Sequence, residues 1–386
     1  MKQRVYRYDN IKALLIFLVV VGHMTTDYAP DSWPVRWITV WIFSFHMPAF
    51  VLVSGILHKR YITEDKAAAG VKGQTALRWD RVIGYILCAY ALKAFLYYSR
   101  MLIWPNPPWH WLSEHSIPWY LFVMAEYELL FYAMRRIDGK VKPWIIIAAS
   151  FALCSAAGYF RLPQEGDFLC LLRFFNFLPF YAIGYYLDMK SFNGWLDKLW
   201  LKITGWLLIA VSLVAFANAP WGIYSWRKWF TGRRSYEWLL EYFDFAVSSG
   251  WWVRLALWGF SLLMALAVIA VIPDRDTGHI SVIGQRTLGI YFWHKPTQYL
   301  LKIGNVLPRL VVLFGGTYNE AVAGPARGLA FGGGSFSMVA GLAVYLIVCA
   351  LITAFFSLKI FEHPCSDLMK LASKISGVSL RRQVRT

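Results

Sequence analysis

Four ionisable side chains lie well inside long apolar stretches of the sequence: His23, His46, Glu128 and His294. An ionisable group at membrane depth costs free energy, so it usually faces protein or water and serves a function. Imidazole titrates near neutral pH, so a histidine at such a position can take a proton from a hydroxyl group and return it. These residues are therefore candidates for acid–base chemistry inside a membrane.

Helical rise, at about 1.5 Å per residue, predicts how deep the first two histidines lie. His23 falls about 16 Å beyond Lys12, and His46 falls about 18 Å from His58 at the far end of the next stretch. Consecutive membrane helices run in opposite directions, so both rings are expected at nearly the same depth.

The same count places His294 about 12 Å beyond Arg286 and Glu128 about 10 Å from Arg135. We therefore expect His294 and Glu128 to meet the other two histidines near the middle of the membrane. A purely structural role stays open for His294 and His46, because each ring could simply hydrogen-bond a backbone carbonyl group.

Two arginines, Arg78 and Arg81, stand three residues apart at the start of the third apolar stretch. That spacing places both guanidinium groups on one face of a helix. Guanidinium groups bind phosphate through two parallel hydrogen bonds, and a helix N-terminus adds partial positive charge. The pair predicts a phosphate site, although anchoring of a membrane helix by positive charge gives the same pattern.

The rest of the chain supplies the apolar elements that must position these groups. Of its 386 residues, 58% are hydrophobic and 18% are aromatic, which is typical of a membrane protein. We expect an all-α, polytopic membrane bundle in residues 1–362 and a basic cytoplasmic tail in 363–386. Ten stretches are long enough to cross a hydrocarbon layer about 30 Å thick: 11–28, 37–57, 81–103, 118–135, 142–160, 168–188, 200–219, 251–272, 281–301 and 336–362.

The net charge of +17 arises from Lys and Arg in short clusters between the apolar stretches, so nucleic acid is not expected as a partner. Most clusters fall on the same side as the basic N-terminus, which the positive-inside rule assigns to the cytoplasm. Both termini are then cytoplasmic. The segment 220–250 conflicts with this orientation, because it places four basic residues on the outer side: Arg227, Lys228, Arg233 and Arg234.

Five cysteines are scattered along the chain, mostly inside apolar stretches. No CxxC pair or other metal-ligand spacing occurs among them. We therefore expect neither a disulfide framework nor a bound metal.

The segment 104–120 is rich in tryptophan and proline and falls on the expected outer side. Its aromatic rings, including Trp119, could pack against the C–H faces of a sugar or form an interfacial aromatic belt. Arg173, near the outer end of the sixth stretch, could contact an acceptor or form a structural ion pair. We expect Trp119 and Arg173 to bind substrate.

Taken in order, these motifs resemble acyltransferase family 3, the integral membrane acyltransferases. Lys12, ten further residues and His23 match its Arg/Lys-X10-His pattern, and the segment from Arg78 to Arg81 matches its Arg-X-X-Arg motif. The resemblance covers nearly the whole chain, and within the family the sequence is similar to the fucose 4-O-acetylase-like branch. Further stretches that look like this family are FSFHMPAFVLVSG, PWYLFVMAEYEL, FFNFLPFYAIGYYL and LGIYFWHKP.

The resemblance implies a ten-helix protein of the cell membrane that transfers an acyl group, usually acetyl, without a permanently bound cofactor. The donor would be cytoplasmic acetyl-CoA or another acyl-CoA, and the acceptor a sugar hydroxyl group on a cell-envelope glycan or glycolipid. Lys12, Arg78 and Arg81 would hold the coenzyme A phosphates. His23 would either remove the hydroxyl proton or briefly carry the acyl group, and both mechanisms stay open.

A proton-coupled secondary transporter is the main alternative, because His23, His46 and Glu128 could equally form a proton relay. No internal repeat is evident in the sequence, however, and many transporter folds are built from repeats. The acyltransferase interpretation is therefore favoured.

Overall fold

The computed structural model describes residues 5–25, 33–69, 77–114, 116–162, 168–240, 243, 246–304, 306–314 and 335–377. Within those ranges the chain is helical, apart from loops and two isolated β-bridges. The short 3-10 helices are η3 (Trp221–Trp226), η4 (Val247–Ser249) and η5 (Lys359–Glu362). The α-helices are α1 (Tyr6–Thr25), α2 (Trp33–Ala69), α3 (Trp79–Met101), α4 (Trp119–Met134), α5 (Pro143–Ala157), α6 (Leu171–Tyr186), α7 (Met189–Leu196), α8 (Leu199–Ala217), α9 (Arg227–Phe230), α10 (Tyr236–Leu240), α11 (Gly250–Val271), α12 (His279–Gln285), α13 (Thr287–Ile303), α14 (Val306–Leu313), α15 (Ser335–Phe356) and α16 (Cys365–Ile375).

Each expected apolar stretch overlaps at least one helix of the structure. In the described part of the chain, four helical segments are long and apolar enough to cross a membrane: Val35–Ile62, Trp79–Met101, Leu199–Ala217 and Val247–Val271. The chain is therefore a helical membrane protein. The count of ten crossings and the cytoplasmic placement of both termini stay predictions.

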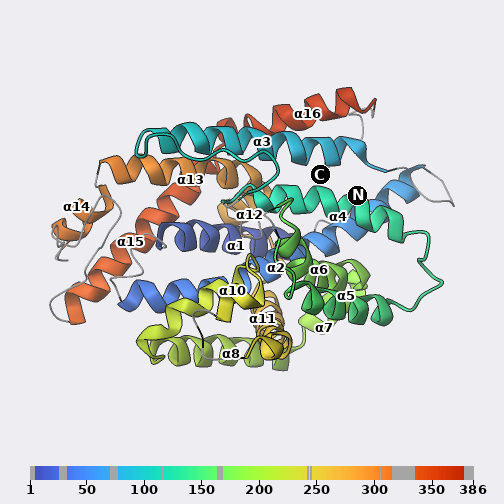
Figure 1. Ribbon diagram of the computed structural model, residues 1–386, viewed down its shortest axis with the longest axis horizontal. Coiled ribbons are helices and arrows are strands. Elements are labelled where there is room, and N and C mark those ends of the chain that lie inside the picture. Colours follow the sequence, from blue (N-terminus) through green and yellow to red (C-terminus); the bar gives the residue numbers. More distant parts are fainter. Residues whose placement is uncertain are drawn as a thin grey trace.

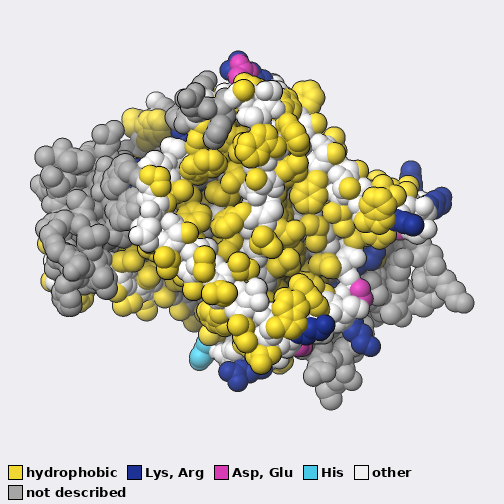
Figure 2. Space-filling view, turned by 90° about the horizontal axis from the view of Figure 1, so that it is seen from below, with side chains coloured by type: hydrophobic (Ala, Val, Ile, Leu, Met, Phe, Trp, Pro, Cys, Tyr) yellow, Lys and Arg dark blue, Asp and Glu magenta, His cyan; other side chains and the backbone are white. Residues whose placement is uncertain are grey.

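The molecular surface is suited to lipid. Large apolar side chains on α8 face outward, with Leu199 72% exposed, Leu207 61% and Val214 63%. Figure 2 shows one face of the molecule covered largely by hydrophobic side chains, with Lys and Arg at its margins. An apolar surface of this extent is a liability in water, whereas bilayer hydrocarbon covers it.

Helix α1 lies at the centre of the bundle and contacts α2, α12, α13 and α15 (Figure 1). Its apolar residues Ile11, Leu15 and Val20 are completely buried. A helix that is apolar on most of its faces belongs in the interior of a bundle. This position leaves both polar residues of the Lys12–His23 motif partly buried inside the bundle.

Helices α2 and α6 pack closely because each presents a glycine at the contact. A Cβ atom on Gly184 would lie 2.1 Å from Leu52 O, and one on Gly55 would lie 2.4 Å from Tyr181 O. Small residues allow membrane helices to approach in this way. The contact sets the Tyr181 hydroxyl group 2.5 Å from Nδ1 of His58.

The expected stretch 281–301 is interrupted at Arg286, where α12 ends and α13 begins. Arg286 Nη1 donates to Ser357 O at 2.9 Å, and its Nε lies 2.9 Å from a carboxylate oxygen of Glu362. These contacts tie the start of α13 to the segment that follows α15.

That segment continues through η5 into α16, which lies along α3 (Figure 1). At the contact, the side chain of Met369 packs against Gly84. The expected tail, 363–386, therefore starts with a packed helix, and its residues 378–386 lie outside the described ranges.

Candidate active site

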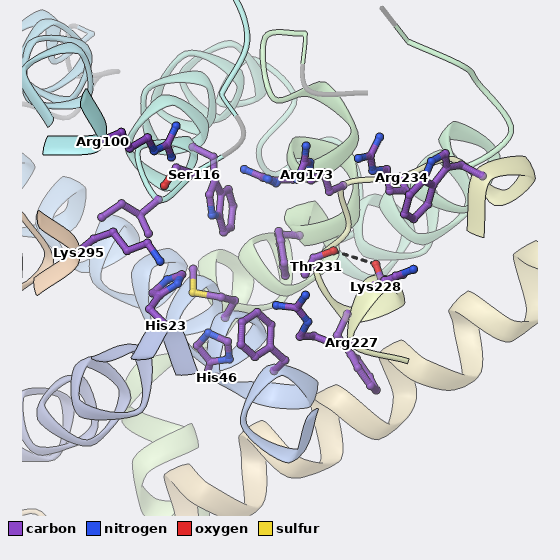
Figure 3. Close-up of a pocket in the computed structure, with 18 of the residues that line it drawn as sticks. His23, His46, Arg100, Ser116, Arg173, Arg227, Lys228, Thr231, Arg234 and Lys295 are labelled. Carbon is purple, nitrogen blue, oxygen red and sulfur yellow. Dashed lines mark hydrogen bonds between the residues drawn. The ribbon is translucent and has the colours of Figure 1, made fainter. Parts of the chain in front are cut away.

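A cavity of about 400 Å³ opens among α1, α2, α4, α6 and α13, beside α9 and the loop that follows it. We call it the histidine cavity. Figure 3 shows His23 and His46 close together on one side of it, with Arg173 across from them. Four residues singled out in the sequence line this cavity: His23, His46, Trp119 and Arg173.

The three histidines predicted from the sequence come together here. The ring centroids of His23 and His294 lie 5.4 Å apart. The ring centroid of Phe43 lies 6.4 Å from that of His23 and 5.1 Å from that of His46. His46 and His294 are only 3% and 1% exposed. The expected convergence is therefore met for the histidines, while their catalytic roles stay predictions.

Two of these rings are oriented by their own helices. Nδ1 of His46 lies 2.7 Å from Ile42 O, and Nδ1 of His294 lies 3.1 Å from Ile290 O. A carbonyl oxygen only accepts hydrogen bonds, so Nδ1 carries the proton in both neutral rings and Nε2 keeps its lone pair. Nε2 of His294 is buried and has no hydrogen-bond partner among the described residues. The hydrogen bond to a backbone carbonyl group, which is the structural role considered for His46 and His294, therefore uses Nδ1 and not Nε2.

The end of α1 is held by two neighbouring helices. Gln298 Nε2 on α13 donates to His23 O, and the Tyr345 hydroxyl group on α15 donates to Val21 O, both at 2.9 Å. His23 O lies in the last turn of α1, where helical N–H donors run out. These two bonds fix the backbone that carries the His23 side chain.

Glu128 lies elsewhere, and the expectation that it joins the histidines is wrong. Its carboxylate pairs with Arg81 on α3 at 2.9 Å and with Nε2 of His58 on α2 at 3.1 Å. Helix α4 begins at Trp119, beside the histidine cavity, so Glu128 lies about 13 Å further along the helix. A buried carboxylate needs a cationic or hydrogen-bonding partner, and both partners are found at that depth.

Glu128 lines a second cavity, of about 220 Å³, which we call the glutamate cavity. Lys12 and Arg81 also line it, as expected of a shared site, but Arg78 does not. Arg78 instead donates to both carboxylate oxygens of Asp80, at 2.9 and 2.8 Å. Arg78 precedes the first residue of α3, so the expectation that it shares a helical face with Arg81 is wrong.

The two cavities are neighbours in the bundle. Trp119 lines the histidine cavity, whereas its neighbour Tyr120 lines the glutamate cavity. On α13, Lys295 lines the histidine cavity, and Tyr291, one helical turn or about 6 Å earlier, lines the glutamate cavity. The rings of Tyr120 and Tyr291 lie 5.9 Å apart, and the Tyr291 hydroxyl group donates to Ile117 O. The two tyrosines therefore form a layer of side chains on the side of the glutamate cavity that is nearer the histidine cavity.

Sequence reasoning missed part of both cavities. His58 served only to mark a helix end, yet it is 1% exposed and binds Glu128. Five arginines and two lysines line the histidine cavity, and only Arg173 among them was expected there. The signal lay in the segment 220–250, whose positive charge contradicts the orientation rule.

The aromatic segment 104–120 contributes Ser116, Ile117 and Trp119 to the histidine cavity. Trp104 and Trp111 do not line it and are 62% and 68% exposed, which is typical of an interfacial belt. All five cysteines are buried and free of disulfides. Among the described residues, no group of three or more His, Cys, Asp or Glu side chains could hold a metal ion.

Comparison with known proteins agrees with the expected family. Residues 5–358 match the acyltransferase 3 family, described as an acyltransferase domain. The chain is also 23% identical over 214 residues to the nodulation protein NolL of Mesorhizobium japonicum (strain LMG 29417 / CECT 9101 / MAFF 303099). That similarity covers 54% of this chain and 54% of the relative, so the chain spans about half the length of the curated relative it matches. No solved structure matches the chain.

Proposed function

The chain belongs to the acyltransferase 3 family, and we propose that it is a membrane O-acyltransferase that moves an acetyl group from acetyl-CoA to a sugar hydroxyl group. The acceptor is a glycan or glycolipid of the cell envelope, as in the fucose 4-O-acetylase-like proteins that the sequence resembles. One observation carries the proposal: two cavities enter the bundle, one lined by Lys12 of α1 and the other by His23, and neighbouring residues of α4 and α13 line the two.

The glutamate cavity receives the donor from the cytoplasm. Arg81 and Lys12 bind the phosphate groups of coenzyme A at its mouth, and Glu128 orients the Arg81 guanidinium group. A volume of about 220 Å³ suits the narrow pantetheine arm and leaves the bulky nucleotide outside. The arm extends along α1 and passes between Tyr120 and Tyr291, so that the thioester reaches His23, about 16 Å beyond Lys12.

The reaction needs a proton acceptor and a positive field at the point of transfer. The sugar hydroxyl oxygen attacks the thioester carbonyl carbon, the C–S bond breaks, and an ester bond forms. His23 takes the hydroxyl proton and returns it to the departing coenzyme A thiolate. Lys295, which extends toward His23 in Figure 3, stabilises the negative charge on the carbonyl oxygen in the transition state.

The other two histidines support this step. Each ring is oriented by a hydrogen bond from Nδ1 to its own helix, so Nε2 is presented in a defined direction. Nε2 of His46 accepts a hydrogen bond from a second hydroxyl group of the sugar. His294 packs beside His23, and its buried Nε2 supports His23 in the proton transfer.

The test is transfer of radiolabelled acetyl from acetyl-CoA into glycans of inverted membrane vesicles. We expect label with the wild type and with the exposed-histidine control His279→Ala, and none with folded His23→Ala. Equal label in all three would remove His23 from the reaction. Absence of label in all three, with the source cell's own glycans present, would overturn the proposed function.

A further inference from the structure

The histidine cavity is strongly positive. Four of its basic residues come from α9 and the loop after it: Arg227, Lys228, Arg233 and Arg234. Three more come from the surrounding helices α3, α6 and α13: Arg100, Arg173 and Lys295. No carboxylate is found among the described residues that line the cavity.

Aromatic rings contact several of these cations, Arg227 and Arg234 among them. The Arg227 guanidinium group lies 4.9 Å from the Tyr224 ring and 5.4 Å from the Phe43 ring. Its Nε is buried, and no described residue hydrogen-bonds it. Arg234 lies 4.1 Å from the Trp238 ring. The cation–π contacts hold the guanidinium plane of Arg227 in place, and its Nε–H group can bind an anion.

The loop that carries these residues is firmly anchored to the bundle. Gly232 has φ of +63°, and a Cβ atom there would lie 2.4 Å from the amide nitrogen of Asn176. The buried Arg254 donates to Asn176 Oδ1 at 2.6 Å and to Arg234 O at 3.4 Å. Burial raises the pKa of Tyr236, whose hydroxyl group donates to Ser155 O at 2.9 Å. The cations therefore occupy a preformed site.

Seven basic side chains around one cavity favour the binding of an anion there. The low-dielectric walls focus their positive potential in the cavity. Arginine forks match the geometry of phosphate oxygens. Binding of an anion would then explain why these basic residues lie on the expected outer side, against the positive-inside rule.

We infer that this cavity binds a phosphate or pyrophosphate group of the acceptor, so that the hydroxyl group to be acylated lies beside His23. The inference rests on the proposed acyltransferase function. A volume of about 400 Å³ accommodates a sugar together with such a group. The acceptor is then a sugar joined to phosphate or pyrophosphate, and the coenzyme A phosphates belong to the glutamate cavity, beyond the layer of Tyr120 and Tyr291.

Binding of inorganic pyrophosphate to the purified full chain in lipid nanodiscs tests the site. We expect Arg227→Gln to weaken this binding at least tenfold, which is about 1.4 kcal/mol. Arg309→Gln, which removes an exposed charge on α14, should leave it unchanged. No binding by the wild type, or equal loss in both variants, would overturn the inference. If Arg227→Gln does not fold, Arg227→Lys is measured in its place. We expect it to bind pyrophosphate more weakly than the wild type, because lysine keeps the charge but lacks the guanidinium fork.

Titration with coenzyme A distinguishes the two sources of phosphate. Its affinity should fall in Arg81→Gln and not in Arg227→Gln. A fall in Arg227→Gln would assign the cavity to the donor and overturn the inference.

The charge of the product separates this inference from the proposed function. After transfer from radiolabelled acetyl-CoA in native membranes, the labelled product should bind an anion exchanger and lose that property after mild acid cleavage of its sugar phosphate. A neutral labelled product would overturn the inference and leave the acyltransferase function standing. If no product is labelled, the function fails, and pyrophosphate binding still decides whether the anion site exists.

Discussion

The imidazole rings of His23 on α1 and His294 on α13 lie 5.4 Å apart, and Gln298, one turn after His294, donates to the backbone carbonyl of His23. The two helices are far apart in the sequence. Their contact places beside the proposed base a buried ring nitrogen that no described residue hydrogen-bonds.

Replacement of His294 by asparagine separates the roles of its two ring nitrogens. The asparagine amide can keep the hydrogen bond to Ile290 O but offers nothing in place of Nε2. We expect His294→Asn to fold like the wild type and to lower kcat about a hundredfold. His294→Gln, which offers an amide group nearer the Nε2 position, should retain more activity. Wild-type turnover in the asparagine variant would make the ring purely structural.

Removal of Glu128 should destabilise the fold. It leaves Arg81 and His58 buried without their carboxylate, which we expect to lower the free energy of unfolding by about 3–5 kcal/mol. Glu126, two residues away, has no ion pair with any described residue, so Glu126→Ala is the matched control. Denaturant unfolding in mild detergent measures both variants, and an equal loss in the two would refute the importance of the ion pair.

Truncation of Tyr291 should open the layer between the cavities. Tyr291→Ala removes both the ring beside Tyr120 and the hydrogen bond to Ile117 O. We expect water to reach the bound thioester, so that coenzyme A is released several times faster in the absence of acceptor. Thiol titration follows that release. Tyr159→Ala, at an exposed tyrosine, should behave like the wild type, and the same rate in Tyr291→Ala would mean that the passage is closed elsewhere.

Gly232 should tolerate no side chain. Its positive φ and its close contact with Asn176 both oppose a Cβ atom, so Gly232→Ala should cost about 1–2 kcal/mol and displace the basic loop. Pyrophosphate affinity should fall with it. At Gly222 a Cβ atom would have no described neighbour within 4 Å, so Gly222→Ala should change neither stability nor affinity. Thermal unfolding and titration of both variants provide the comparison.

The sequence was informative wherever a polar residue interrupts an apolar stretch. His23, His46 and His294 stand out for that reason, and a count of helical rise was enough to predict their common depth. Rise along one helix does not reveal which neighbouring helix a side chain faces. Glu128 was misplaced because its partners, Arg81 and His58, are set by the packing of α3 and α2 against α4.

Local structure accounts for the remaining differences. Arg78 has the expected spacing from Arg81, but α3 begins at Trp79. Arg78 therefore lies outside the helix, and the spacing does not place both arginines on one helical face. The positive cavity depends on a loop folded against Asn176 and Arg254, which no periodic pattern encodes. Only the breach of the orientation rule by segment 220–250 indicated it.

Helix α13 carries Tyr291 in the dividing layer, His294 beside the proposed base, Lys295 in the histidine cavity and Gln298 on the α1 carbonyl. One helix therefore contributes side chains to both cavities, so a shift of α13 as a unit would change both. Any movement of α13 on donor binding would thus change acceptor affinity, and thermodynamic linkage would require the reverse effect by the same factor. The enzyme would then hold its thioester closed to water until the second substrate arrives.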